Sequence, residues 1–139
     1  MKTENKQQII IDAENAVLGR LASYAAKQAL MGKEIVIVNA NDVVIIGNRN
    51  NILEKYVIIV KKGGSSLKGP KISRTPERLL KRTIRGMLPH KKGRGEDAVD
   101  KIKCYNETPE EFKNSKKIIA GKIKTGKFMK LSELVSLIK

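Results

Sequence analysis

The residues of this chain that could bind an anionic partner are concentrated in one basic stretch, residues 61–94. The stretch holds twelve basic residues and a single acid, Glu77, and so carries +11 of the +15 net charge of the 139-residue chain. Arginine and lysine at this density bind phosphate, and a planar guanidinium group can grip two phosphate oxygens at once. The candidate binding residues, with the only histidine among them, are Lys61, Lys62, Lys68, Lys71, Arg74, Arg78, Lys81, Arg82, Arg85, His90, Lys91, Lys92 and Arg94.

The alternative interpretation of such a stretch is an ordinary solvated surface, as most charged runs are. Twelve like charges opposed by one acid repel one another, however, unless a polyanion neutralises them. The stretch contains no aromatic residue, so aromatic stacking on nucleic-acid bases is not expected. The composition therefore favours binding to the shape and the phosphates of a folded nucleic acid.

The centre of the stretch, residues 75–89, has the pattern of an amphipathic helix. Thr75 is placed to cap the helix, Pro76 suits its first position, and Pro89 ends it. At roughly 100° per residue, the basic and the apolar residues fall on opposite sides. The basic side consists of Arg78, Lys81, Arg82 and Arg85, and the apolar side of Leu80, Ile84, Met87 and Leu88. This helix is expected to bury one side and to present the other to an anion.

The two flanks of this helix, residues 61–74 and 90–95, hold few apolar residues and several glycines. Because little in them can be buried, we expect both flanks to be mobile alone and to become ordered on a polyanion. Gly93 and Gly95 are expected to let the backbone approach a nucleic-acid strand closely.

Other patterns that could support catalysis or ligand binding are weak. Residues 121–127 fit the phosphate-loop spacing G-x-x-x-x-G-K, but Phe128 stands where a hydroxyl should hold Mg²⁺. His90 has no second histidine or nearby cysteine for a metal site. The only cysteine, Cys104, lies in an alternating apolar run typical of a buried structural thiol. We therefore expect no enzyme activity, no cofactor or metal, and no small-molecule substrate.

Short β-branched runs alternate with helical spacing along the rest of the chain. Strands are expected at residues 9–12, 35–38, 43–46 and 102–105, and helices at 18–31, 47–62, 94–100 and 132–138. Asn15 is the expected cap of the first helix, and residues 57–60 could also serve as a strand. The order predicts an α/β fold whose first crossover joins parallel strands, and no domain boundary is expected within residues 1–139.

The cysteine content and the hydropathy indicate a cellular setting. A single cysteine excludes an internal disulfide and suits a reducing compartment. No apolar run approaches the roughly 20 residues that span a bilayer, and the first eight residues do not resemble a signal peptide. We therefore expect a cytoplasmic protein with no membrane partner.

Several segments of the chain resemble one known family. Residues 11–23, from Ile11 to Ser23, look like the N-terminal signature of the universal large-subunit ribosomal protein thirteen family. The other similar segments are Val38-Asn39-Ala40, Ile46-Gly47, Arg85-Gly86-Met87-Leu88-Pro89, Gly93-Arg94, Ile102-Lys103-Cys104-Tyr105 and Pro109-Glu110-Glu111-Phe112. The last of these and the closing helix look like the archaeal branch. After Tyr105, where a glycine is common in the family, this chain has Asn106 and Glu107.

The resemblance implies a three-layer α/β/α single domain, residues 1–139, around a small, mainly parallel four-stranded sheet with basic loops. It also implies a non-catalytic function. On that ground we expect a structural constituent of the large ribosomal subunit that binds large-subunit ribosomal RNA and supports early subunit assembly. It would lie in the cytoplasm, in the ribosome, beside neighbouring ribosomal proteins. Two alternatives from other classes stay open: a nucleotide-binding protein that uses residues 121–127, and a module that binds polyanions or membrane surfaces.

Overall fold

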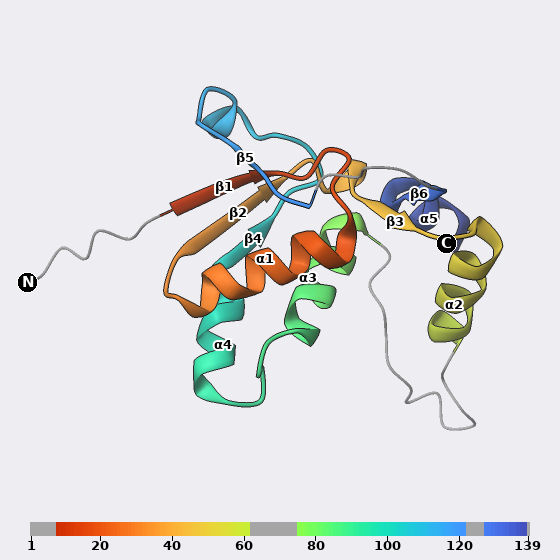
Figure 1. Cartoon of the computed structure of the whole chain (residues 1–139), viewed down its shortest axis with the longest axis horizontal. Coiled ribbons are helices and arrows are strands. Elements are labelled where there is room, and N and C mark those ends of the chain that lie inside the picture. Colours follow the sequence, from red (N-terminus) through yellow and green to blue (C-terminus); the bar gives the residue numbers. More distant parts are fainter. Residues whose placement is uncertain (1–7, 62–74, 122–126, 139) are drawn as a thin grey trace, which may run out of the picture.

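The computed structural model describes residues 8–61, 75–121 and 127–138 (Figure 1). The strands and helices of these residues are β1 (Gln8–Asp12), α1 (Leu18–Leu30), β2 (Glu34–Val38), β3 (Val44–Ile46), α2 (Arg49–Lys61), α3 (Pro76–Gly86), α4 (Gly93–Asp100), β4 (Ile102–Cys104), β5 (Ile118–Ile119), β6 (Phe128–Lys130) and α5 (Leu131–Ile138). Two short 3-10 helices, η1 (Ala40–Asp42) and η2 (Glu110–Phe112), complete the order. All the expected helices are present, and the segment that could also have formed a strand is helical in α2.

Four parallel strands form the main sheet, in the order β4-β2-β1-β5. β1 and β2 pair along their whole length, with Ile10 opposite Val36, and β4 joins β2 on its other side, with Lys103 opposite Val36. β1 and β2 are nearly continuous runs of isoleucine and valine, as is usual for parallel strands covered on both faces. The pairing confirms the α/β class and the mainly parallel four-stranded sheet.

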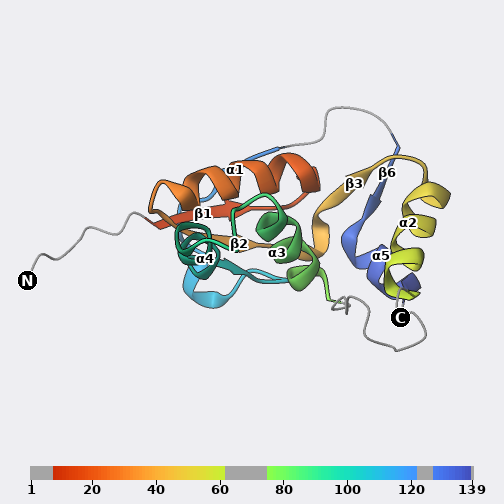
Figure 2. The ribbon, with the colours of Figure 1, turned by 90° about the horizontal axis from the view of Figure 1, so that it is seen from below.

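The expected third strand does not join this sheet. β3 pairs antiparallel with β6, with Ile45 opposite Met129. We use the name two-stranded layer for this pair of strands together with the helices α2 and α5. This layer forms one end of the molecule (Figures 1 and 2). The chain leaves the main sheet after β2 because Asn39 adopts a left-handed conformation, with a φ of 63°, ahead of η1. The fourth place in the main sheet goes to β5, which pairs with the end of β1.

The two faces of the main sheet are covered in different ways. Ile11 faces the main core, which also contains the buried residues of α1, α3 and α4. Ile10 faces the other side and packs near Tyr105 and Phe112, whose ring centroids are 6.1 Å apart. Figure 2 shows α1 on one side of β1 and β2 and the light-blue segment near residue 110 on the other. The second outer layer is therefore the single turn η2 rather than a longer helix.

The first two helices of the chain begin with different kinds of cap. Asn48 caps α2, since its Oδ1 accepts the backbone N–H of Asn50 at 2.9 Å. The prediction that Asn15 caps α1 is wrong: Asn15 lies in the preceding turn with a φ of 59°, and Val17 holds the N-cap position. Val17 is fixed there because its N–H donates to the carbonyl oxygen of Gly121 at 2.7 Å.

Candidate nucleic-acid interface

The basic helix α3 is anchored by a residue from outside the basic stretch. Pro76 holds the first helical position, and Thr75 has the extended backbone of an N-cap residue, as expected. The Thr75 hydroxyl does not cap the helix. Instead, Oδ1 of Asn106 accepts the backbone N–H of Glu77 at 3.1 Å. The segment that follows β4 thus holds the first turn of α3 against the sheet.

α3 has a buried side and a cationic side. Leu80 and Ile84 are completely buried in the main core. The opposite side carries Arg78, Arg82 and Arg85, which are exposed, and Lys81, which is partly buried. The prediction that Met87 lies on the buried side is wrong, since Met87 is 46% exposed. α3 ends at Gly86, so Met87 no longer follows the helical spacing.

Internal contacts hold the connection from α3 to α4. Nδ1 of His90 lies 3.2 Å from the carbonyl oxygens of both Arg85 and Leu88, so this nitrogen must be the one that donates a proton. Gly95 is buried against Pro89, and a Cβ at Gly95 would overlap the Pro89 carbonyl. Gly95 therefore serves packing within the protein, and not the expected approach of a nucleic-acid strand. The flank 90–95 is more firmly held than its composition suggests.

Eight of the thirteen candidate binding residues lie on α3, on the connection that follows it, or at the start of α4. These eight, which we call the basic surface, are Arg78, Lys81, Arg82, Arg85, His90, Lys91, Lys92 and Arg94. Lys61 is the last residue of α2. Lys62, Lys68, Lys71 and Arg74 lie outside the described residues.

α2 lies near the basic surface. Burial raises the pKa of the Tyr56 phenol on α2, and the positive charge of Arg82 partly offsets that rise. A groove of about 550 Å³ runs between these elements, and Lys55 and Tyr56 of α2 line it together with Thr83 of α3. The part of α2 that carries Lys55 and Tyr56 therefore lies beside the cationic helix α3.

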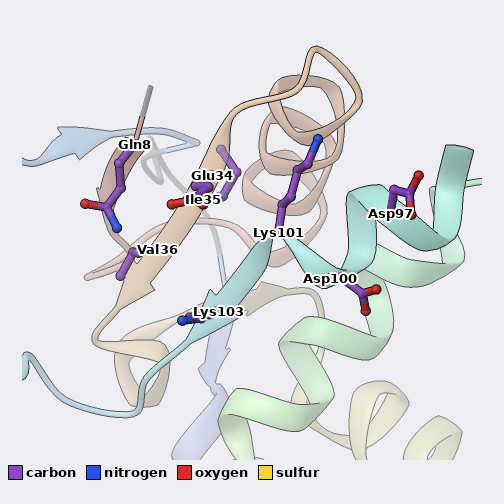
Figure 3. A pocket seen from close by; sticks show the side chains of 8 residues that line it. All are labelled: Gln8, Glu34, Ile35, Val36, Asp97, Asp100, Lys101 and Lys103. Carbon is purple, nitrogen blue, oxygen red and sulfur yellow. The ribbon is translucent and has the colours of Figure 1, made fainter. Parts of the chain in front are cut away.

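A separate hollow of about 420 Å³ lies at the edge where β1 and β2 begin, and its charged lining consists of Glu34, Asp97, Asp100, Lys101 and Lys103 (Figure 3). Figure 3 shows the side chains of Lys101, Asp97 and Asp100 pointing in different directions rather than toward one ligand. Ligands of open α/β sheets bind at the opposite edge, where parallel strands end. Because the hollow mixes both signs of charge, we do not assign it to nucleic acid.

The comparison with known proteins decides the family. A model described as ribosomal protein L13 matches residues 6–111, which include the whole basic stretch. The chain belongs to the ribosomal protein L13 family. The large ribosomal subunit protein uL13 of Methanocaldococcus jannaschii is 45% identical over 128 residues, which cover 90% of this chain and 93% of that protein. The uL13 proteins of Methanosarcina barkeri and Archaeoglobus fulgidus are 42% and 40% identical, over 90% and 96% of this chain and 93% and 89% of their own lengths.

Membership of the ribosomal protein L13 family confirms the resemblance read from the sequence. It makes the chain a ribosomal protein with a structural rather than an enzymatic function. It also agrees with the expected place of the protein, in the ribosome and thus in the cytoplasm.

The structure disfavours the nucleotide-binding alternative. Phe128, which follows the phosphate-loop pattern, is the first residue of β6, whereas such a loop must lead directly into the N-terminus of a helix. Gly121, the first residue of the pattern, lies close to Arg20 and Leu21 of α1. Residues 122–126 lie outside the described residues.

Cys104 is only partly buried, whereas its sequence context predicts a buried structural thiol. It packs against the main core, and burial raises the pKa of its thiol to about 12, an effect that the charge of Lys81 partly offsets. A thiol with this pKa stays protonated at neutral pH and is a poor nucleophile. Within the described ranges, no three His, Cys, Asp or Glu side chains gather into a metal site, and no helix is long and apolar enough to cross a bilayer.

Two cations next to the basic surface were missed by the sequence reasoning. Lys55 lines the groove beside α3, and Lys27 of α1 lines another groove to which Arg94 contributes. The sequence could have indicated Lys27, because Arg20 and Lys27 are seven residues apart in α1 and therefore lie on the same side of that helix. Both are exposed, opposite the alanines that α1 buries.

Proposed function

We propose that this protein is a structural constituent of the large ribosomal subunit and binds large-subunit ribosomal RNA through the basic surface. The observation that carries the proposal is the arrangement of α3, in which Ile84 is completely buried while Arg82 and Arg85 are exposed. A helix anchored on one side presents its cations in a fixed pattern, so less entropy is lost when RNA binds. The relatives named large ribosomal subunit protein uL13 support the assignment.

The binding would depend on phosphates and on the shape of the RNA. Each lysine or arginine that reaches a phosphate displaces condensed counterions, which favours association at low salt. Arginine adds directed hydrogen bonds to two phosphate oxygens. On their charge and their place in the basic stretch, we also assign the RNA contact to Lys61, Lys62, Lys68, Lys71 and Arg74.

We also propose an early step of subunit assembly and contacts with neighbouring ribosomal proteins, as the family resemblance implies. The two-stranded layer supports the second part, since it exposes apolar surface at Ile46, Phe128 and Leu137. Depletion of the protein tests the early step: precursor particles should then accumulate before most large-subunit proteins have joined. A normal set of precursor particles would contradict it.

Binding of the full chain to three partners at one salt concentration tests the RNA proposal. The partners are large-subunit ribosomal RNA, small-subunit ribosomal RNA and anionic lipid vesicles. We expect the tightest binding to the large-subunit RNA, weakened by the double substitution Arg82→Ala with Arg85→Ala. The matched control replaces Lys113 and Lys116, which are exposed cations outside the basic stretch, with alanine. Equal binding to all three partners would instead support a general polyanion-binding module.

A further inference from the structure

A groove beside the basic surface combines apolar side chains with cations. It has a volume of about 600 Å³ and lies between α1 and the chain around the α3–α4 connection. Its lining residues are Ser23, Ala26, Lys27, Leu30, Met31, Met87 and Arg94. In the described part of the chain, no acidic residue lines this groove. Met31 and Met87 are 62% and 46% exposed, so two large apolar side chains stand among cations.

The chemistry of this lining suits a flat aromatic ring that is joined to an anion. The thioether of methionine is polarisable and packs favourably on aromatic rings. The guanidinium plane of Arg94 can stack on such a ring, and the ammonium of Lys27 offers a point charge to a phosphate. A nucleotide carries both a flat ring and a phosphate. The lack of aromatic residues in the basic stretch does not exclude this mode, because sulfur and guanidinium groups can replace an aromatic platform.

We infer that this groove receives one unpaired nucleotide of the bound ribosomal RNA, with its base packed on Met31 and Met87. The inference rests on the proposed function and specifies how one part of the RNA is held. The groove is continuous with the basic surface, since Met87 follows α3 directly and Arg94 belongs to both. Bases within A-form helices are hidden in a deep and narrow groove, so an unpaired base is what side chains can reach. An acidic peptide would also match the charge, but the adjoining array of cations fits a long phosphate backbone better.

A double substitution, Met31→Ala with Met87→Ala, tests the inference without changing the charge. We expect the affinity for purified large-subunit ribosomal RNA to fall about three- to tenfold, the effect of losing two sulfur–ring contacts. The slope of log affinity against log salt should stay the same, because no phosphate contact is removed. The melting temperature should hardly change, since neither side chain is part of the buried core. The matched control is Ile118→Ala with Ile119→Ala, exposed apolar residues of β5, which should leave the affinity unchanged.

The outcomes separate this inference from the proposed function. If the methionine variant binds as tightly as the unaltered chain, the inference is wrong and the proposed function stands. If its salt slope also falls, the groove contributes through phosphates rather than through a base, and the inference is again wrong. If the unaltered chain does not bind large-subunit ribosomal RNA, the proposed function fails as well.

Cross-linking gives a second, positional test. Ser23 is exposed and lines the groove, so Ser23→Cys can carry a short photo-reactive label; the native Cys104 thiol stays protonated and reacts slowly. In the complex with large-subunit ribosomal RNA, we expect the label to mark an unpaired nucleotide, mapped by reverse transcription. The same label at the exposed Ser136 of α5, introduced by Ser136→Cys, should not mark that nucleotide. Cross-links from the groove only to paired RNA, or in whole subunits only to a protein, would overturn the inference.

Discussion

Oδ1 of Asn106 accepts the backbone N–H of Glu77 at 3.1 Å, and this bond joins residues 29 positions apart in the sequence. The carbonyl oxygen of Asn106 also accepts the N–H of Asn41, at 3.3 Å. One residue therefore links the first turn of the basic helix α3 to the edge at which the parallel strands end. A glycine at position 106 would have no side chain to make the first of these bonds.

Asn106→Ala should weaken the start of α3. The substitution removes the acceptor for the Glu77 N–H, and loss of a helix cap costs about 0.5–2 kcal/mol of the free energy of unfolding. Urea denaturation measures this cost, and Asn106→Asp should restore part of it, because a carboxylate can accept the same N–H. The control Asn114→Ala changes an exposed asparagine and should have almost no effect. Equal losses for Asn106→Ala and Asn114→Ala would show that the bond does not support the helix.

Local sequence patterns were sufficient to predict most helices and strands and the two sides of α3. The spacing of Leu80 and Ile84 against Arg82 and Arg85 is set by helical geometry, which depends only on neighbouring residues. The same holds for α5, where Leu134, Val135 and Ile138 recur at helical spacing and are buried. The mainly parallel sheet was implied by the family resemblance, because short apolar runs indicate strands but do not specify how they pair.

What could not be predicted depends on contacts between distant parts of the chain. The place of β3 outside the main sheet requires pairing with β6, and the cap of α3 requires Asn106. The fixed turn at 90–95 depends on the approach of Gly95 to the Pro89 carbonyl, which no spacing rule reveals. The groove lined by Met31 and Met87 forms only when α1 and the end of α3 are packed together.

Substitutions on the two sides of α3 should have opposite effects. Ile84→Ala removes a completely buried side chain and should lower the free energy of unfolding by about 2–5 kcal/mol. Arg82→Ala and Arg85→Ala should leave the melting temperature nearly unchanged and weaken RNA binding, since both side chains are exposed. Thermal melting and RNA titration of all three variants give the comparison. Similar losses of melting temperature in all three would show that the two sides are assigned wrongly.

Gly95 and Gly93, both in the first turn of α4, offer a matched pair of substitutions that tests how the α3–α4 connection is held. A Cβ at Gly95 would meet the Pro89 carbonyl, whereas a Cβ at Gly93 would meet nothing within 4 Å. We expect Gly95→Ala to cost about 1–3 kcal/mol of stability, the range for overpacked sites, and to weaken RNA binding by shifting Lys91 and Lys92. Gly93→Ala should be nearly neutral in denaturation. If the two variants behave alike, the close approach at Gly95 does not hold the turn.

The partly buried thiol of Cys104 should make the free energy of unfolding fall at high pH. The unfolded thiol ionises near its ordinary pKa of 9.0, while the folded thiol stays protonated up to about pH 12. As the pH rises, the unfolded state therefore loses the thiol proton before the folded state does. The contribution of Cys104 to the free energy of unfolding is present below pH 9 and is lost between about pH 9 and pH 12. Subtracting the unfolding free energy of Cys104→Ala from that of the unaltered chain removes the effects of other groups. A difference that stays constant across this pH range would contradict the prediction.

The dependence of RNA affinity on salt tests the central claim most directly, namely that the cations of residues 61–94 bind the phosphates of ribosomal RNA. If about six to ten phosphates are neutralised, the slope of log affinity against log salt should lie between roughly −4 and −9. Arg82→Ala should make the slope less negative by about one. A slope for the unaltered chain shallower than about −2 would contradict the claim.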